Sequence, residues 1–413
     1  MFIRRLVCIS IVPIIAAATL TACRPESPGR DEAVVRDSAG VRIVESSAPA
    51  WPDGESWHLS AEPTMEIGVL EGPPEYQLFQ VRGAVRFSDG RIVVANGGTD
   101  ELRIYDPGGR FLTSAGREGS GPGEFGALGS LDKLEGDSLL TWDWRNNRVQ
   151  IFDSAGNFTR SFMLQPGGEA PGPLQPAGIF DDGSILTRMV PLFTPNDQAG
   201  VSRGSMTYMR HDGDGMLLDT IGRFPGPEHF VRTAEHSVSV YPLAFGRVSA
   251  IAVAGDGIFF GTGDSYEIEY HSADGELLRI IRLSRPAVPV TAEDRRRFTE
   301  ETLERVDERW RAGFERALEE MSFAKTMPAY SSLLIDSEGH LWVSDYRPPG
   351  HRGPRRRNVF GLEGRFLGPV EIPPRFEVFE IGADYVLGRH SDEMDVERVR
   401  LYRLDKPSPI TRR

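Results

Sequence analysis

Apolar and polar residues alternate along most of the chain, in short segments separated by tight turns. The clearest example has apolar segments at 129–131, 138–143, 148–152 and 158–162, with turns at 136–137 and 153–156. Alternation with a period of two is typical of strands that have one buried face, and glycine supplies the positive φ that tight turns need. The pattern predicts a four-stranded antiparallel unit.

The turns of this unit recur along the chain. The turn between the first two strands is found at 89–90, 136–137, 182–183, 256–257, 338–339 and 383–384. A later Asp/Gly turn recurs at 106–109, 153–156, 212–215 and 273–275, with a degenerate copy at 362–364. The shorter intervals match the roughly 40–45 residues of a propeller blade, and the longer intervals contain insertions. We therefore expect an all-β, six-bladed β-propeller, with a pair of β-sandwiches as the alternative fold.

A glycine-rich segment at 116–125 follows the fourth strand of the first unit, and weaker echoes lie at 68–76 and 222–230. All three are expected where one unit passes to the next. Together with Asp143, Asn146, Asn147 and Arg148, the segment resembles the repeat of NHL-type propellers. The resemblance is close over 116–162 and diffuse over 81–117 and 248–404, and other units lack the Asn-Asn-Arg step. It implies membership of a broad superfamily of six-bladed propellers.

The last unit is one strand short. It offers strands at 376–381, 385–390 and 396–404, whereas an unassigned strand at about 57–67 precedes the first unit. An N-terminal strand that completes the last blade would cover both exposed edges. We therefore expect the propeller to span 57–404, followed by a tail at 405–413. The segment 41–45 has the pattern of one more edge strand, for which the sequence gives no position.

The N-terminus predicts export. Arg4 and Arg5 precede an apolar run at 6–19, and Leu20-Thr21-Ala22 then leads to Cys23. This is the layout of a secretory signal, and the run is too short for a membrane span. It also resembles the bacterial lipobox, which implies cleavage after residue 22 and lipid on Cys23. An ordinary signal peptide is the alternative.

A lipid anchor would make the membrane a partner, with residues 23–56 as a tether and possible edge strand. Several acyl chains hold a protein at a bilayer where one chain does not. The residue after Cys23 is Arg24 and not Asp, which resembles the pattern of lipoproteins that are sorted to an outer membrane. The expected location is the cell envelope, with the protein anchored in the outer membrane and facing the periplasm or the exterior.

Net charge and cysteine content limit the classes of binding partner and the disulfides that we expect. The formal net charge is −13, and loss of Arg4 and Arg5 with the signal makes it −15. This charge argues against nucleic acid as a partner. Cys8 would leave with the signal, so the mature chain would keep only Cys23 and form no internal disulfide.

The insertions should decorate one face of the disc. In a four-stranded blade, the second turn and the link to the next blade lie on the face opposite the first and third turns. The long segments at 191–204, 223–247, 284–328 and 347–357 all belong to the second class. Because binding often resides on loops carried by a rigid scaffold, this face is the expected binding face.

A helix is expected within the insertion at about 291–322, with Thr291 as its N-cap. Its apolar residues recur at helical spacing and form one stripe, namely Phe298, Leu303, Val306, Trp310, Phe314, Leu318 and Met321. The stripe is expected to pack on the disc as a lid. The alternative is a groove for a partner or ligand beneath Trp310 and Phe314.

The segment 347–357 carries six basic residues, namely Arg347, His351, Arg352, Arg355, Arg356 and Arg357. A solvated loop is one interpretation. The other is a site for phosphate, carboxylate or an acidic polymer, because arginine forks match those groups. Changing Arg352, Arg355, Arg356 and Arg357 together to Ser is expected to alter stability little, because exposed charges contribute little individually.

No catalytic motif supports an enzyme. The chain has no His-Glu-x-x-His, no Gly-x-Ser-x-Gly, no P-loop and no cysteine nucleophile. Some six-bladed propellers are metal-dependent lactonases, for which Asn96, Asp143 and Asn146 could be offered as ligands, although such residues are more often turn formers. We therefore expect no cofactor and a non-catalytic module that binds a protein, glycan or anionic ligand. The alternative is a hydrolase or lyase with a divalent cation in the central channel.

Overall fold

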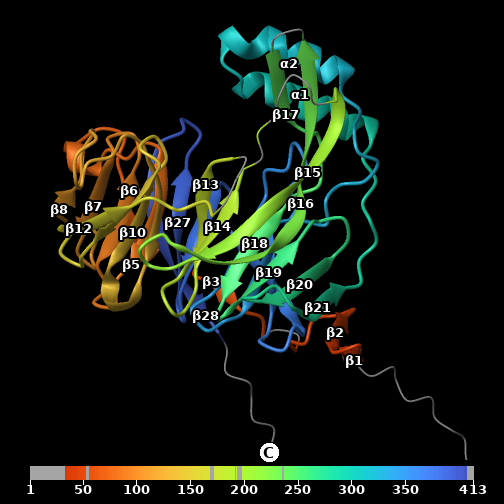
Figure 1. The fold of residues 1–413 in the computed structure, drawn as a ribbon, viewed down its shortest axis with the longest axis horizontal. Coiled ribbons are helices and arrows are strands. Elements are labelled where there is room, and N and C mark those ends of the chain that lie inside the picture. Colours follow the sequence, from red (N-terminus) through yellow and green to blue (C-terminus); the bar gives the residue numbers. More distant parts are fainter. Residues whose placement is uncertain are drawn as a thin grey trace, which may run out of the picture.

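The structure is a computed structural model that describes residues 33–52, 55–167, 172–190, 192, 198–234 and 237–406. The predicted signal at 1–22 and Cys23 lie outside the described residues. The described chain is almost entirely β-structure, with two short helices, α1 and α2 (Figure 1). None of its helices has the length and apolar character that crossing a membrane requires.

The described strands form six sheets, which we number in chain order. Sheet 1 has the order β5-β6-β7-β8, and sheet 2 has the order β9-β10-β11-β12. Their strands are β5 (Val81–Arg86), β6 (Ile92–Asn96), β7 (Glu101–Tyr105), β8 (Phe111–Ala115), β9 (Leu128–Lys133), β10 (Leu139–Asp143), β11 (Arg148–Phe152) and β12 (Phe158–Phe162). All neighbouring strands in these two sheets are antiparallel.

Sheets 3 and 4 are larger. Sheet 3 has the order β13-β14-β15-β16-β17, and sheet 4 has the order β18-β19-β20-β21-β2-β1. Their strands are β13 (Leu174–Ile179), β14 (Ile185–Met189), β15 (Gly200–His211), β16 (Leu217–Ala234), β17 (Ser237–Pro242), β18 (Ala250–Ala254), β19 (Gly257–Gly261), β20 (Glu267–Ser272), β21 (Leu277–Leu283), β1 (Val34–Ser38) and β2 (Val41–Ser46). The segment 41–45, which had no predicted place, therefore lies in β2, and β2 pairs in parallel with β21.

Sheets 5 and 6 complete the β-structure. Sheet 5 has the order β22-β23-β24-β25, and in sheet 6 the strands β26, β27 and β28 are joined by β3 and β4. The strands are β22 (Tyr330–Ile335), β23 (Leu341–Asp345), β24 (Arg355–Phe360), β25 (Phe366–Ile372), β26 (Phe376–Ile381), β27 (Tyr385–Ser391), β28 (Glu397–Asp405), β3 (His58–Leu59) and β4 (Met65–Ile67). Short 3-10 turns lie at Pro74–Tyr76 and Glu135–Asp137.

The predicted turns lie where the pattern placed them, between the first and second or third and fourth strands of a sheet. The Asp that opens a later turn folds it locally. Asp153 Oδ1 accepts the backbone N–H groups of Ala155 at 2.9 Å and Asn157 at 2.8 Å, and Gly156 follows with φ of 87°. Asp106 and Asp212 accept backbone N–H groups at the same spacings. Short-range hydrogen bonds therefore explain why this turn repeats in the sequence.

The N-terminal strand completes the last sheet, as the missing fourth strand predicted. β4 pairs antiparallel with β28, with Ile67 opposite Val399 and Met65 opposite Leu401. β3 pairs with the end of the same strand. Gly68 follows β4 with φ of 126°, and a Cβ there would lie 2.7 Å from the carbonyl oxygen of Glu397. The close approach of the two chain segments therefore requires glycine.

Neighbouring sheets share apolar cores. Leu102 and Phe152 belong to one core between sheets 1 and 2, and Phe224 and Phe260 to one between sheets 3 and 4. The same holds between sheets 2 and 3, 4 and 5, and 5 and 6. Sheet 6 also shares a core with sheet 1, to which Ile67 contributes. This arrangement of mostly four-stranded sheets is consistent with a β-propeller.

Sheet 3 differs from the predicted unit. The segment 222–230 lies inside β16 and does not link two sheets, and 223–247 contains a further strand, β17, where the sequence suggested a loop. The reason is that β15 and β16 stay paired as far as Gly200 opposite Val231. The glycine and proline residues of 222–230 therefore lie within a long two-stranded ribbon. Figure 1 shows this ribbon rising away from the other sheets toward α1 and α2.

The helical insertion also differs from the prediction of one helix. It contains α1 (Ala292–Arg305) and α2 (Glu308–Glu320). Thr291 caps α1 with a complete capping box, as expected of this N-cap. Val306 is extended, and Asp307 caps the second helix by accepting the backbone N–H of Arg309 at 3.0 Å. The cap at Asp307 therefore interrupts an apolar stripe that is continuous in the sequence.

The insertions share a core of their own. Phe230 lies on β16 and Phe245 follows β17, Ala317 lies on α2, and Met321 and Met327 follow the helices. The rings of Phe245 and Phe298 on α1 are 5.4 Å apart, and those of Phe245 and Tyr346 are 6.5 Å apart. Insertions that are far apart in the sequence therefore form one packed structure beside the β23–β24 connection.

The role of β4 can be tested by truncating one side chain. Ile67 is 1% exposed and belongs to the core shared by sheets 1 and 6. Ile67→Ala should lower the free energy of unfolding by about 2–5 kcal/mol, as expected for a buried large-to-small change. Val34→Ala on exposed β1 is the matched control and should change it by less than about 0.5 kcal/mol. Denaturant unfolding measures both, and equal effects would contradict the closing role of β4.

Candidate anion-binding site

The connection between β23 and β24 surrounds a cavity of about 340 Å³. β23 ends at Asp345, the chain continues through 346–354, and β24 begins at Arg355. The cavity lies at the end of sheet 5 from which the insertions extend. Its lining consists of Asp345, Tyr346, Arg347, Pro348, His351, Pro354, Arg355, Arg356 and Glu371.

The connecting loop is held in place from two sides. The backbone N–H of Gly350 donates to Glu301 of α1 at 2.5 Å. Within the loop, the backbone N–H of His351 donates to the carbonyl of Pro348 at 3.2 Å, and His351 Nε2 lies 3.1 Å from the carbonyl oxygen of Pro354. Because these contacts fix the loop before any ligand is present, the cavity is preformed, which reduces the ordering cost of binding.

The cavity carries an excess of positive charge. Within the described part of the chain, the side chains of Arg347, Arg355 and Arg356 have no hydrogen-bond or ion-pair partner. Asp345 is already engaged, since Arg285 Nη1 lies 3.0 Å from its Oδ1 and Asn358 Nδ2 donates to the same oxygen at 2.6 Å. The arginines are thus left with unused donors facing a cavity.

The surroundings shift several pKa values. Burial, together with the positive charge of Arg347, lowers the pKa of Arg355. Burial raises the pKa of Asp345 even though Arg285 acts against this shift. Burial also raises the pKa of Tyr346 to about 12, so its phenol is neutral at physiological pH. An anion in the cavity would relieve the repulsion between the arginines.

The structure corrects the picture of 347–357 as one solvated loop. Residues 355–357 belong to β24, and Arg357 is only 6% exposed. Side chains alternate between the two faces of a strand, so Arg355 and Arg357 point into the space between sheets 5 and 6. The premise that Arg352, Arg355, Arg356 and Arg357 are all exposed is therefore wrong for Arg357, and the four cannot be treated as equivalent surface charges.

The cavity brings together four of the predicted site residues, namely Arg347, His351, Arg355 and Arg356. Arg352 is exposed and does not line it. Trp310 is 60% exposed, with the Arg309 guanidinium 5.4 Å from the ring centroid. Phe314 packs edge-to-face on Tyr241 with centroids 4.9 Å apart. Neither aromatic residue of α2 contributes to the arginine-lined cavity.

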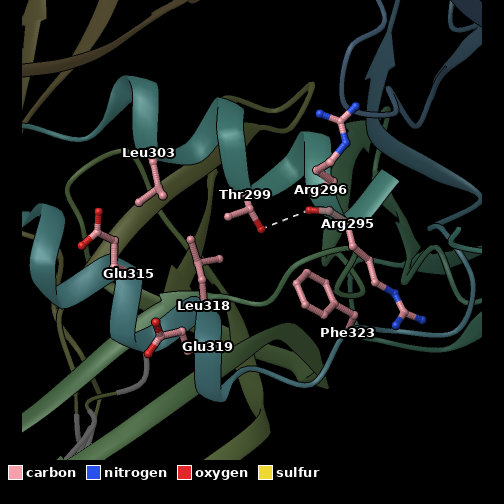
Figure 2. A pocket seen from close by; sticks show the side chains of 8 residues that line it. All are labelled: Arg295, Arg296, Thr299, Leu303, Glu315, Leu318, Glu319 and Phe323. Carbon is pink, nitrogen blue, oxygen red and sulfur yellow. Dashed lines mark hydrogen bonds between the residues drawn. The ribbon is translucent and has the colours of Figure 1, made fainter. Parts of the chain in front are cut away.

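A second cavity of about 290 Å³ lies between the helices (Figure 2). Figure 2 shows Leu303 of α1 and Leu318 of α2 pointing toward each other, with Phe323 below Arg295. The guanidinium of Arg295 lies 5.6 Å from the Phe323 ring, and Arg296 is paired with Glu293 and Glu300. Its basic residues therefore already have partners, and the arginine-lined cavity is the stronger candidate site.

Sequence reasoning missed several residues of the site. Tyr346 directly precedes the basic segment and Pro348 lies within it, so both could have been included on that ground. Glu371 could not, because only the β24–β25 register places it opposite Arg356.

The residues considered as channel metal ligands have structural partners. Asp143 is fully buried and accepts the backbone N–H groups of Gly126 at 3.0 Å and Ala127 at 3.1 Å, as well as Asn146 Nδ2 at 2.7 Å. Asn96 Oδ1 accepts the backbone N–H of Phe79 at 2.8 Å. These side chains hold turns and strand ends together.

One other group of potential metal ligands exists among the described residues, formed by Asp336, Glu338 and His340. Asp336 accepts the indole N–H of Trp342 at 3.0 Å and the backbone N–H of His340 at 2.8 Å. Lys406 is paired with Glu338. The carboxylates of this acidic turn are therefore already bound by hydrogen-bond donors and a lysine of the chain itself.

No family model and no curated protein matches the chain. Solved structures with a similar fold include a Bacteroides fragilis protein that is described as an exported protein. It shows 14% identity over 88% of this chain and 100% of that chain, with a TM-score of 0.46. A member of the DUF4221 family from Bacteroides vulgatus shows 10% identity over 85% and 99% of the two chains, with a TM-score of 0.49. A catalytically inactive virginiamycin B lyase from Staphylococcus aureus shows 11% identity over 85% and 100%, with a TM-score of 0.41. Likenesses at this level support no conclusion about function.

Proposed function

We propose that the chain is a lipid-anchored, six-bladed β-propeller of the cell envelope that binds an anionic ligand without catalysis. The ligand enters the arginine-lined cavity at the β23–β24 connection. This proposal rests on a preformed cavity lined by Arg347, Arg355 and Arg356, whose side chains have no hydrogen-bond or ion-pair partner among the described residues.

The proposal of a propeller rests on the packing between neighbouring sheets. Each sheet shares an apolar core with the next, and sheet 6 shares one with sheet 1. The pairing of β4 with β28 is the closure that ring-shaped folds commonly use. The resemblance of 116–162 to the NHL repeat supports the same fold.

The binding part rests on chemistry and size. A guanidinium presents N–H donors in a rigid fork that matches carboxylate and phosphate oxygens. The volume of about 340 Å³ is near the lower end of the roughly 300–1,000 Å³ typical of ligand pockets. The cavity therefore suits a small anion or the acidic end group of a larger protein or glycan.

A non-catalytic role is favoured because the residues that an enzyme of the lactonase type would use are engaged elsewhere. Asp143 and Asn146 bond to each other at 2.7 Å, and Asn96 donates to Thr99 at 2.7 Å while accepting from Phe79. The hydrolase or lyase alternative would need other ligands for its metal. Its test is the metal content of the purified protein.

The anchoring part rests on the sequence alone. Cys23 follows a signal-like segment, and the described chain begins its first strand at Val34. Only a short tether would thus separate the lipid from the sheets. Anchoring in the outer membrane would hold the cavity within the periplasm or at the cell exterior.

Cys23→Ser should leave an uncleaved or soluble protein, because the thiol is the proposed acceptor of the lipid. The measurement is membrane fractionation combined with the mass of the intact protein. Cys8→Ser is the matched control and should leave both unchanged, since Cys8 lies within the removed segment. Membrane partitioning and mass that are the same for Cys23→Ser and the wild type would refute the anchor.

Arg356→Ser and Arg347→Ser should each weaken binding of an anion at the cavity roughly tenfold or more, because each removes a charge-assisted hydrogen bond of about 1.5–3 kcal/mol. Suitable probes are a fluorescent hexaglutamate peptide and a labelled oligogalacturonide, titrated by fluorescence anisotropy. Binding should weaken with salt, because exposed charges are screened over about 8–10 Å at physiological ionic strength.

Arg352→Ser is the control for these variants, since Arg352 is an exposed arginine of the same loop that does not line the cavity. It should retain wild-type affinity. Equal affinities of the Arg352, Arg347 and Arg356 variants at low salt would exclude this cavity as the binding site.

A further inference from the structure

Three buried polar atoms on sheet 5 have no hydrogen-bond partner among the described residues. They are Ser344 Oγ on β23, and Arg355 Nε and Arg357 Nη1 on β24. Buried polar groups in proteins are normally hydrogen-bonded, so each exception needs an explanation. Because these three atoms lie on two neighbouring strands, one explanation should account for all of them.

The strand register places these atoms on one face. Ser344 lies directly opposite Arg357 in the β23–β24 ladder. Side chains that face each other across a ladder share a face of the sheet, with Cβ atoms about 4.5–5.5 Å apart. Arg355 is two residues from Arg357 along the same strand, so its side chain also emerges on that face. The three side chains therefore emerge next to one another on this face, and the charge of Arg355 acts on Arg357. We call these three residues the buried cluster.

The cluster faces sheet 6. Trp342 and Val359 share the face of Ser344 and Arg357 by the same alternation, and they belong to one core with Phe376 and Val378 of β26. Ser344 is 1% exposed and Arg357 is 6% exposed. Both side chains are thus enclosed between two sheets, where water cannot freely serve their donors.

The nearby acid is already occupied. Glu377 of β26 acts electrostatically on both Arg355 and Arg357. Its Oε2, however, accepts from Arg389 Nη2 at 2.5 Å, and no hydrogen bond joins Glu377 to Arg355 or Arg357 within the described part of the chain. Burial, with the charge of Arg355, lowers the pKa of Arg357 to about 10, so the guanidinium is still protonated at neutral pH. A buried cation without a bonded counter-charge is strongly unfavourable.

We infer that Ser344, Arg355 and Arg357 form an oxyanion subsite that receives the terminal carboxylate or phosphate of the bound ligand. This inference rests on the proposed function, because Arg355 also lines the arginine-lined cavity and connects the two. The guanidinium forks and the hydroxyl donate to the anion, which supplies the counter-charge that the cluster lacks. The remainder of the ligand lies in the outer cavity, beside Tyr346 and Pro348.

The subsite restricts the ligand class to molecules that end in a compact, unesterified oxyanion. An amide or ester at that end would leave the arginines without a counter-charge and is excluded. Because the subsite lies between sheets 5 and 6, its occupation should also stabilise the packing of these sheets. A free small anion is then a sufficient probe of the subsite.

The test uses the full-length purified protein and measures its melting temperature against phosphate, sulfate and acetate at constant ionic strength. For the wild type, the melting temperature should rise in a saturable manner with at least one of these anions, because an anion bound only by the folded state stabilises it. The anion with the lowest half-saturating concentration identifies the head group as phosphate-like or carboxylate-like.

Arg357→Met should abolish the rise and increase the melting temperature in the absence of the anion, because it replaces a buried uncompensated charge by an apolar chain of similar length. Arg352→Met makes the same change at an exposed arginine and should keep the wild-type response. Ser344→Ala guards against misfolding of the Arg357 variant. It should fold normally and raise the half-saturating concentration roughly tenfold, as loss of one hydrogen bond to a charged group implies.

Two results would overturn the inference. One is the absence of a saturable shift with all three anions, and the other is an equal shift in the wild type, Arg357→Met and Ser344→Ala. The inference can also fail while the proposed function holds. If Arg356→Ser weakens binding of the acidic peptide while Ser344→Ala leaves it unchanged, the outer cavity binds the ligand and the buried subsite does not exist.

Discussion

The pairing of β4 with β28 is the interaction on which the rest of the structure depends. Every sheet has apolar residues on both faces, so each face must be covered by another sheet. Ile67 joins Val81 of sheet 1 and Leu387 and Val399 of sheet 6 in one core. A segment from the beginning of the chain thus covers the edge of the last sheet and contributes to its contact with the first.

This closed scaffold explains where the insertions can go. The turns folded by Asp153 and its counterparts are too short to carry additional structure. The long ribbon of β15 and β16, the two helices and the loop at 346–354 instead gather on one side and share the core around Phe245. Gly350, bonded to Glu301 of α1, connects that core to the loop of the candidate site. The insertions therefore support the site as well as cover the sheets.

The candidate site combines a polar outer cavity with a buried cationic cluster. Arg347, Arg355 and Arg356 line the cavity, and Arg357 and Ser344 are buried between sheets 5 and 6. Such a cluster costs stability in the free protein, since burial opposes the charged form. Functional sites commonly retain groups that would be unfavourable without a ligand.

Much of the fold was predictable because its signals are local. The Asp/Gly turns and the alternating strands follow from hydrogen bonds and contacts over a few residues, and counting strands in the last unit identified the closing segment. The extension of β15 and β16 was not predictable from the sequence. The glycine and proline residues of 222–230 are typical of a connection between two units, whereas in the structure this segment pairs with β15. The break at Asp307 was hidden because the apolar spacing continues through Val306.

The candidate site was predictable only in part. The density of arginine between 347 and 357 suggested an anion site as the alternative to a solvated loop. Because arginine is usually exposed, nothing in the sequence marked Arg357 as buried. Ser344 and Glu371 join the site through the registers of β23–β24 and β24–β25. Such partners become visible only when the strands are paired.

The proposed oxyanion site lies buried between sheets 5 and 6. Its most direct measurement is anomalous diffraction from crystals of the full-length protein soaked in tungstate, a heavy tetrahedral oxyanion. We expect an anomalous peak within hydrogen-bonding reach of Ser344 Oγ and the Arg357 guanidinium, and no such peak in crystals of Arg357→Met. Tungstate bound only at the exposed Arg352, or Arg357 bonded to Glu377 with no ion nearby, would contradict it.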